Sequence, residues 1–199
     1  MNKEVSIIPL GKSAAPPSAV FTIGHSVRAI EAFLELLARH AIEHLVDVRR
    51  FPASRRHPHF GGPSLAPTLS THGVAYTHLP DLGGRRSPQP GSRQLGWRNA
   101  SFRAYADYMQ TDEFELETAR LLTIAERERS VVMCAESLPW RCHRSLIADA
   151  LVARGVPVLH ILDAGLRMHE LPPFARVRES RVEYPDPRGD APSPDLFAE

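Results

Sequence analysis

Short apolar runs alternate along the chain with longer amphipathic segments. The run VFTIGHS (20–26) is rich in β-branched and aromatic residues and ends in Gly-His-Ser, which is typical of a buried strand. Comparable runs at 44–52, 74–80, 130–134 and 156–162 predict four further strands. The apolar positions therefore predict a sheet of about five strands.

The segments between these runs carry apolar residues at helical spacing. The expected helices cover 27–40, 65–72, 101–128 and 144–155. Ser26 is expected to cap the first of them, because a serine hydroxyl accepts a hydrogen bond from a free N–H group at a helix start. Thr111 is expected to cap a second helix within 101–128, and Gly155 to end the last helix.

Strands that alternate with helices are typical of a parallel sheet covered on both faces. We therefore expect an α/β fold: a single-domain, three-layer sandwich with a mainly parallel sheet of about five strands. The domain is expected to cover 19–170, after a flexible N-terminal segment at 1–18. Residues 171–199 lose the apolar periodicity and gain Pro, Asp and Arg, which predicts a largely non-globular C-terminal tail.

Both cysteines of the chain, Cys134 and Cys142, lie in one expected strand-to-helix connection. The N–H groups at a helix start and a nearby arginine both stabilise a thiolate, so this position favours a nucleophilic cysteine. A carboxylate and an imidazole in the same connection could move protons. The predicted catalytic residues are Cys134, Glu136, Cys142, His143 and Arg144. The alternative is that both cysteines only pack the core.

Two other kinds of cysteine site can be compared with this spacing. Cysteine-based phosphatases have five residues between the nucleophile and an arginine, whereas Trp140 stands at that position after Cys134, so the phosphatase loop is excluded. The candidate metal ligands are Cys134, Cys142 and His143, with His25, His57, His59 or His78 as a fourth. Their spacing is not that of a usual structural zinc site. No cofactor is predicted, and a metal ion is kept as an alternative.

The net charge is only +1, but positive charge concentrates in 45–103, where nine arginines and no lysine face two acids. Arginine favours bidentate binding of phosphate or carboxylate. Side chains that could stack on bases interleave with the arginines, namely Phe51, His57, His59, Phe60 and Trp97. An anionic small molecule or a nucleic acid is therefore the expected partner. Alternatively, the arginines pair with acids or face solvent, and Asp47 is expected to orient one of them.

No run of about 18 apolar residues occurs, so we expect no membrane-spanning helix. Two cysteines in 199 residues do not form a disulfide scaffold, and the N-terminus has no apolar region of secretory length. These features favour a cytoplasmic protein with reduced thiols. A protein partner that docks on the last residues, PDLFAE (194–199), is a weaker expectation.

Five stretches form an ordered set: TIGHS (22–26), LVDVRRFPASRRHPHF (45–60), LPDLGG (79–84), FRAYADYMQTDEF (102–114) and MCAESLPWRCHRSLIADAL (133–151). This set resembles the domain-of-unknown-function 488 family of bacterial and archaeal proteins, over about residues 20–163. The resemblance implies a cytosolic α/β domain and leaves the reaction open. From the family-like positions outside the cysteine loop, we take as substrate-binding Gly24, His25, Ser26, Asp47, Arg49, Arg55, Gly83 and Gly84.

We therefore expect an enzyme whose Cys/Glu/His/Arg site lies at the carboxyl edge of the sheet, because ligands of parallel sheets bind there. The expected reaction is a Cys-dependent or Glu/His-dependent hydrolysis or transfer on an anionic substrate, such as a nucleotide or nucleic acid. Two alternatives stay open. One is a non-catalytic module that binds nucleotides or nucleic acid, and the other is a metal- or redox-sensing protein.

Overall fold

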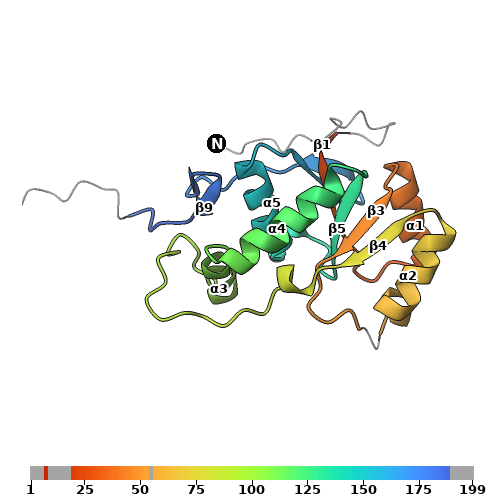
Figure 1. Ribbon diagram of the computed structural model, residues 1–199, viewed down its shortest axis with the longest axis horizontal. Coiled ribbons are helices and arrows are strands. Elements are labelled where there is room, and N and C mark those ends of the chain that lie inside the picture. Colours follow the sequence, from red (N-terminus) through yellow and green to blue (C-terminus); the bar gives the residue numbers. More distant parts are fainter. Residues whose placement is uncertain (1–6, 9–18, 54–55, 189–199) are drawn as a thin grey trace, which may run out of the picture.

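A sheet with helices on both faces forms the core of the protein (Figure 1). The computed structural model describes residues 7–8, 19–53 and 56–188. One face of the sheet carries α1 (Ile30–Arg39) and α2 (Gly62–Thr71), and the other carries α3 (Ala100–Tyr108), α4 (Asp112–Ala125) and α5 (Arg144–Ala153). The predicted α/β sandwich of three layers is confirmed.

Five parallel strands form the centre of the sheet, in the order β6 (Val158–Leu162), β2 (Val20–Gly24), β5 (Ser130–Cys134), β3 (His44–Asp47) and β4 (Ala75–His78). These are the five strands that the apolar runs predict. Two further strands, β7 (Gly165–Met168) and β1 (Ile7–Ile8), continue the sheet antiparallel beside β6. The sequence pattern missed β7 because four residues are too few to show a period of two.

The alternation of side chains along each strand divides the core into two parts. Phe21 and Met133 pack toward α1 and α2, whereas Val20 and Val132 pack toward α3, α4 and α5. Burial of side chains of this size stabilises the fold by roughly 1.5–3 kcal/mol each, relative to exposure. The same alternation places Cys134 on the face that α5 covers.

The two predicted N-terminal helix caps, Thr111 and Ser26, have different outcomes in the structure. Thr111 caps α4 as predicted, since its Oγ1 accepts a hydrogen bond from the N–H of Phe114 at 3.3 Å. Ser26 does not cap α1, so that prediction is wrong; the cap residue is Ala29, which has no side-chain cap. Ser26 has φ +51°, and its N–H donates to the Ala135 carbonyl at 2.9 Å. The chain after β2 therefore stays attached to the end of β5 before the helix begins.

The remaining elements are short. Three 3₁₀ turns cover η1 (Pro58–Phe60), η2 (Pro80–Leu82) and η3 (Pro139–Arg141), and a separate hairpin consists of β8 (Arg176–Arg178) and β9 (Arg181–Glu183). No helix in the described part of the chain is long and apolar enough to cross a membrane.

Residues 171–199 were expected to be largely non-globular. For 171–188, which the structure describes, the hairpin corrects this prediction. Val182 and Tyr184 are buried against α5, and the Tyr184 hydroxyl donates to Asp149 at 2.6 Å. Two buried anchors are enough to order a segment whose other residues are mostly polar. Residues 189–199, and the segment 1–18 apart from β1, lie outside the described residues.

The carboxyl ends of β2 and β5 form the topological switch point of the sheet. The chain leaves β2 through α1 on one face and reaches β3, whereas it leaves β5 through α5 on the other face and reaches β6. These two connections depart from neighbouring strands in opposite directions. A crevice forms where connections diverge in this way, and it is the usual ligand site of such sheets.

Candidate functional site

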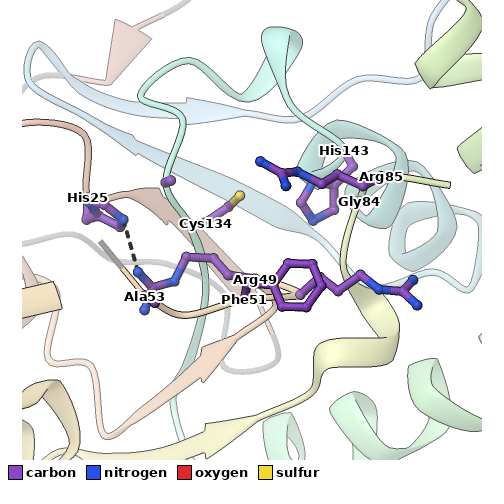
Figure 2. A pocket seen from close by; sticks show the side chains of 10 residues that line it. His25, Arg49, Phe51, Ala53, Gly84, Arg85, Cys134 and His143 are labelled. Atoms are coloured by element: carbon purple, nitrogen blue, oxygen red, sulfur yellow. Dashed lines mark hydrogen bonds between the residues drawn. The ribbon is translucent and has the colours of Figure 1, made fainter. Parts of the chain in front are cut away.

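A pocket of about 610 Å³ opens at this switch point (Figure 2). We call it the arginine pocket, and it is lined by His25, Arg49, Arg50, Phe51, Ala53, Gly84, Arg85, Cys134, Ala135 and His143. Among the described residues, no carboxylate lines it. A second pocket of about 530 Å³, called here the thiol pocket, shares five of these residues and adds Glu136, Arg141 and Cys142 among others. The two pockets therefore meet at Cys134 and His143.

The loop between β5 and α5 brings the two cysteines into contact. Both thiols are free, and Cys134 and Cys142 are only 8% and 5% exposed. The Cys142 sulfur lies 3.6 Å from Nδ1 of His143, and the donor atoms of the three residues all lie within 4.8 Å of one another. An imidazole and two thiols thus form one cluster, of which Cys134 and His143 line both pockets and Cys142 lines the thiol pocket.

The two thiols do not hold their protons equally. A hydrogen bond from the Cys134 thiol holds the pKa of Cys142 well below its usual range, and His143 and Arg144 act in the same direction against the effect of burial. Donation to Cys142, together with burial, raises the pKa of Cys134 well above its usual value. Cys142 is therefore the thiolate of the pair, and Cys134 is its hydrogen-bond donor.

Arg144 lies beneath this pair and does not point into either pocket. Its side chain is 1% exposed, and its guanidinium donates to the carbonyls of Glu136 and Ser137, the latter at 3.2 Å. Among the described residues, no carboxylate lies within 4.0 Å of it. Arg144, predicted as a catalytic residue, lies close to the thiols, and its contacts are those of a buried charge that also fastens the loop.

Gly24 permits this close approach of the loop. A Cβ atom on Gly24 would lie 1.9 Å from the Glu136 carbonyl oxygen and 2.9 Å from an Arg144 nitrogen. No side chain can fit there without moving the backbone. Gly24 therefore supports the site from below, and it lines neither pocket.

His143 and Glu136 face the thiol pocket. Nδ1 of His143 is directed to Cys142, whereas its buried Nε2 has no partner in the described ranges. A Cβ atom on Gly84 would lie 3.0 Å from Nδ1, so the absence of a side chain at Gly84 leaves room for the imidazole. The Glu136 side chain is exposed, and its backbone N–H bonds to the Cys134 sulfur.

His25 and Arg49 form the opposite wall of the arginine pocket, as the dashed contact in Figure 2 shows. Asp47 is fully buried and accepts from Arg49 at 2.9 Å and 2.6 Å, and from the Tyr76 hydroxyl at 2.8 Å. This is the orienting role expected of Asp47. Burial and the neighbouring Arg49 lower the pKa of His25 to about 4, so this imidazole is neutral at physiological pH. Its Nε2 lies 3.2 Å from Arg49.

The arginines of 45–103 divide into structural and available ones. Arg86 stacks on the Tyr108 ring at 3.4 Å, and Arg103 donates twice to the Trp97 carbonyl. Arg50 and Arg85 are exposed, line the arginine pocket and form no ion pair with any described residue. These two are therefore available to an anion.

The stacking candidates divide in the same way. Phe60 is buried and stacks on His25 at a centroid distance of 4.3 Å, and Trp97 packs against Phe102, Phe174 and Tyr184. Phe51 is 65% exposed at the rim of the arginine pocket. Of these three aromatic residues, Phe51 is the one placed to stack on a ligand.

The structure brings most of the predicted site residues together. Residues that line the arginine or the thiol pocket are His25, Arg49, Gly84, Cys134, Glu136, Cys142 and His143. Residues that support the site from behind are Gly24, Asp47, Gly83 and Arg144. Ser26 lines a shallower neighbouring pocket together with Glu136, and Arg55 lies outside the described residues.

Sequence reasoning missed some residues of the site. Arg50 and Arg85 belong to the arginine-rich segment, but the sequence does not indicate that these two arginines line the pocket. Behind the thiols, a buried hydrogen-bonded chain runs through Thr22, His160, His169 and Asp149. No sequence signal marks it, because its members come from β2, β6, the segment after β7, and α5.

Cys134, Cys142 and His143 could also hold a metal ion, since two thiolates and an imidazole suit zinc or another borderline metal. The described residues provide no fourth ligand to this group. Of the histidines considered for that place, His25 bonds to Ser26 and Arg49, and His78 bonds to the Arg49 carbonyl.

Fold and site together define a class of protein: an α/β sandwich with a paired-thiol centre at the switch point of its sheet. A family model described as "Domain of unknown function DUF488" matches residues 29–151. Because this match covers more than half of the chain, the protein belongs to that family, and the resemblance seen in the sequence motifs is confirmed. No curated protein and no solved structure matches the chain.

Proposed function

We propose that this protein is a thiol-dependent hydrolase or transferase that acts on an anionic substrate held where the arginine pocket and the thiol pocket meet. The observation that carries the proposal is the placement of the Cys134–Cys142 pair at the junction of two pockets. The described lining of one of them contains arginines and no carboxylate. A thiolate beside fixed positive charge is a reactive nucleophile near neutral pH, because the charge keeps the thiol ionised there.

In this mechanism the Cys142 thiolate attacks an electrophilic carbon or phosphorus atom of the substrate. The new sulfur bond forms as the bond to the leaving group breaks, and a proton passes to the leaving group from His143. Water or another acceptor then gives a proton back to His143, displaces the sulfur and restores the thiolate. Arg144 stabilises the thiolate before the attack and after its release.

The pocket walls indicate the substrate class. Arg50 and Arg85 offer planar, bidentate donors to a phosphate or carboxylate. Phe51 offers an exposed ring beside them on which a base could stack. A nucleotide or a nucleic-acid end combines both features. A cytoplasmic location would keep the two thiols reduced, as this chemistry requires.

The test is the rate of Cys142 alkylation as a function of pH, followed by peptide mass spectrometry. The same chain unfolded in urea provides the reference of an ordinary thiol. We expect Cys142 to react near neutral pH, nucleoside phosphates to protect it, and a covalent adduct to accumulate on it during turnover. Reaction of Cys142 only near pH 8.5 or above, as for an ordinary thiol of roughly that pKa, would remove the basis of the proposal.

The same experiments separate the alternatives. A nucleic-acid- or nucleotide-binding module would bind without turnover, and its affinity would fall steeply with salt because arginine–phosphate contacts release counterions. A metal sensor would contain stoichiometric metal after purification, and both thiols would be unreactive until a chelator is added.

A further inference from the structure

A line of hydrogen-bonded side chains runs through the core from Arg144 to the inner face of α5. Arg144 Nη1 lies 3.4 Å from Oγ1 of Thr22, which lies 2.7 Å from Nδ1 of His160. His160 Nε2 lies 2.9 Å from Nδ1 of His169, whose Nε2 lies 2.7 Å from Oδ1 of Asp149. We call Thr22, His160, His169 and Asp149 the Thr22–Asp149 chain.

The chemistry of these groups sets the direction of each hydrogen bond. Arg144 can only donate, so the Thr22 oxygen accepts from it and the Thr22 hydroxyl donates to Nδ1 of His160. The proton of a neutral His160 then lies on Nε2, which donates to Nδ1 of His169. His169 in turn donates its Nε2–H to Asp149. These hydrogen bonds all point from the arginine toward the carboxylate.

Burial and a tyrosine hydroxyl keep the hydrogen bonds of the Thr22–Asp149 chain in this direction. Burial lowers the pKa of His160 to about 2, so its ring stays neutral. The Tyr184 hydroxyl donates to the second oxygen of Asp149 at 2.6 Å, so both carboxylate oxygens have a donor. Tyr184 belongs to the segment after β9, so this segment covers the Asp149 end of the Thr22–Asp149 chain.

At its Thr22 end, the Thr22–Asp149 chain contacts a buried cation, the guanidinium of Arg144. Its other hydrogen bonds, to the carbonyls of Glu136 and Ser137, come from the cysteine loop itself. Within the described residues, Thr22 is the one group from the sheet that bonds to the guanidinium. A buried charge is stable only where hydrogen bonds satisfy it, so its position depends on this contact.

We infer that the Thr22–Asp149 chain positions the Arg144 guanidinium against the thiol pair, so its members are positioning residues for the thiolate. The inference rests on the proposed function, because it concerns the same thiolate. None of the four residues lines the arginine pocket or the thiol pocket. Three of them, His160, His169 and Asp149, line a separate pocket of about 390 Å³, and the contact of the chain with the thiol site runs through Arg144.

The test compares Thr22→Val, which removes the hydroxyl and keeps the shape, with Thr22→Ser, which keeps the hydroxyl. The readout is the alkylation rate of Cys142 at pH 7, normalised to the folded fraction. We expect Thr22→Val to react roughly three- to tenfold more slowly than the parent, and Thr22→Ser to stay within about twofold of it. Thr77→Val is the matched control, since Thr77 Oγ1 also bonds a histidine, His44, at 2.8 Å on a strand away from the thiols. Its alkylation rate should not change.

A second readout does not depend on thiol reactivity. The ¹⁵N resonances of the two rings should show both His160 and His169 as neutral rings with a proton on Nε2, and Thr22→Val should shift Nδ1 of His160. Rings in another protonation state would overturn the inference. Equal alkylation rates for Thr22→Val and the parent, with a fast parent, would overturn the inference alone. A parent in which Cys142 reacts as an ordinary thiol would overturn the proposed function, and the inference with it.

Discussion

The sulfur of Cys142 lies 3.6 Å from Nδ1 of His143 at the start of α5. The imidazole is held there between the sulfur on one side and Gly84 on the other, where a Cβ atom would lie 3.0 Å from Nδ1. A glycine from the loop after β4 thus decides where this imidazole can lie. The geometry of the candidate site depends on contacts between loops that are distant in sequence.

Replacement of Cys134 should change the reactivity of Cys142. The Cys134 thiol is the group that contributes most to the lowered pKa of Cys142, since it donates a hydrogen bond to the thiolate. Cys134→Ala removes this donor, so we expect the pH profile of Cys142 alkylation to move to higher pH. Cys134→Ser keeps a donor and should move the profile less. Identical profiles for the two variants and the parent would contradict the assignment of Cys134 as donor.

Gly24→Ala should destabilise the protein and slow the alkylation of Cys142. The added methyl group would meet the Glu136 carbonyl oxygen at 1.9 Å, so the loop that carries the thiols must move. We expect a loss of roughly 1–3 kcal/mol in the free energy of unfolding, measured by urea denaturation. Gly62→Ala is the control, because its nearest neighbour is the Tyr76 hydroxyl at an ordinary 3.4 Å. Equal stability of the two variants would show that the close approach is not required.

The layers of the fold were predictable because they depend on local periodicity. The five parallel strands and the cap at Thr111 follow from apolar spacing and from one hydroxyl in the right place. The cap at Ser26 was predicted wrongly because the competing partner, the Ala135 carbonyl, comes from a strand far away in sequence. Tyr184 was missed for the same reason, since its partner Asp149 belongs to α5.

The candidate site was predictable only in part. The carboxyl-edge rule collects Cys134 and His25 at one end of the sheet, and the structure places both in the arginine pocket. The rule could not separate Arg49, which is bound to buried Asp47, from Arg85, which is exposed. Which arginine is neutralised depends on side-chain contacts, and a charge count does not contain them.

Acid should destabilise the protein partly through His25. Its pKa is lowered from 6.5 to about 4 in the folded state, first by burial and then by Arg49. The unfolded chain therefore binds the proton more readily, so the contribution of His25 is full above pH 6.5 and is lost as the pH falls toward 4. The slope is at most roughly 1.4 kcal/mol per pH unit.

His25→Gln should make this loss shallower, as urea denaturation at several pH values between 7 and 4 would show. His40 and His160 also have lowered pKa values, so some loss should persist in the variant. Parallel pH profiles for parent and variant would mean that His25 does not titrate differently in the folded and unfolded states.

Arg85→Gln should weaken the binding of anions and leave the fold intact. Arg85 is exposed, lines the arginine pocket and forms no ion pair with any described residue, so its removal leaves no buried charge without a partner. A charge-assisted hydrogen bond to a phosphate contributes roughly 1.5–3 kcal/mol, so protection of Cys142 by a nucleoside phosphate should require roughly tenfold or more ligand. Arg98→Gln is the matched control, because Arg98 is exposed in the same arginine-rich segment and lines neither pocket. Equal protection in both variants, at unchanged melting temperature, would place the anion elsewhere and remove the arginine pocket from the mechanism.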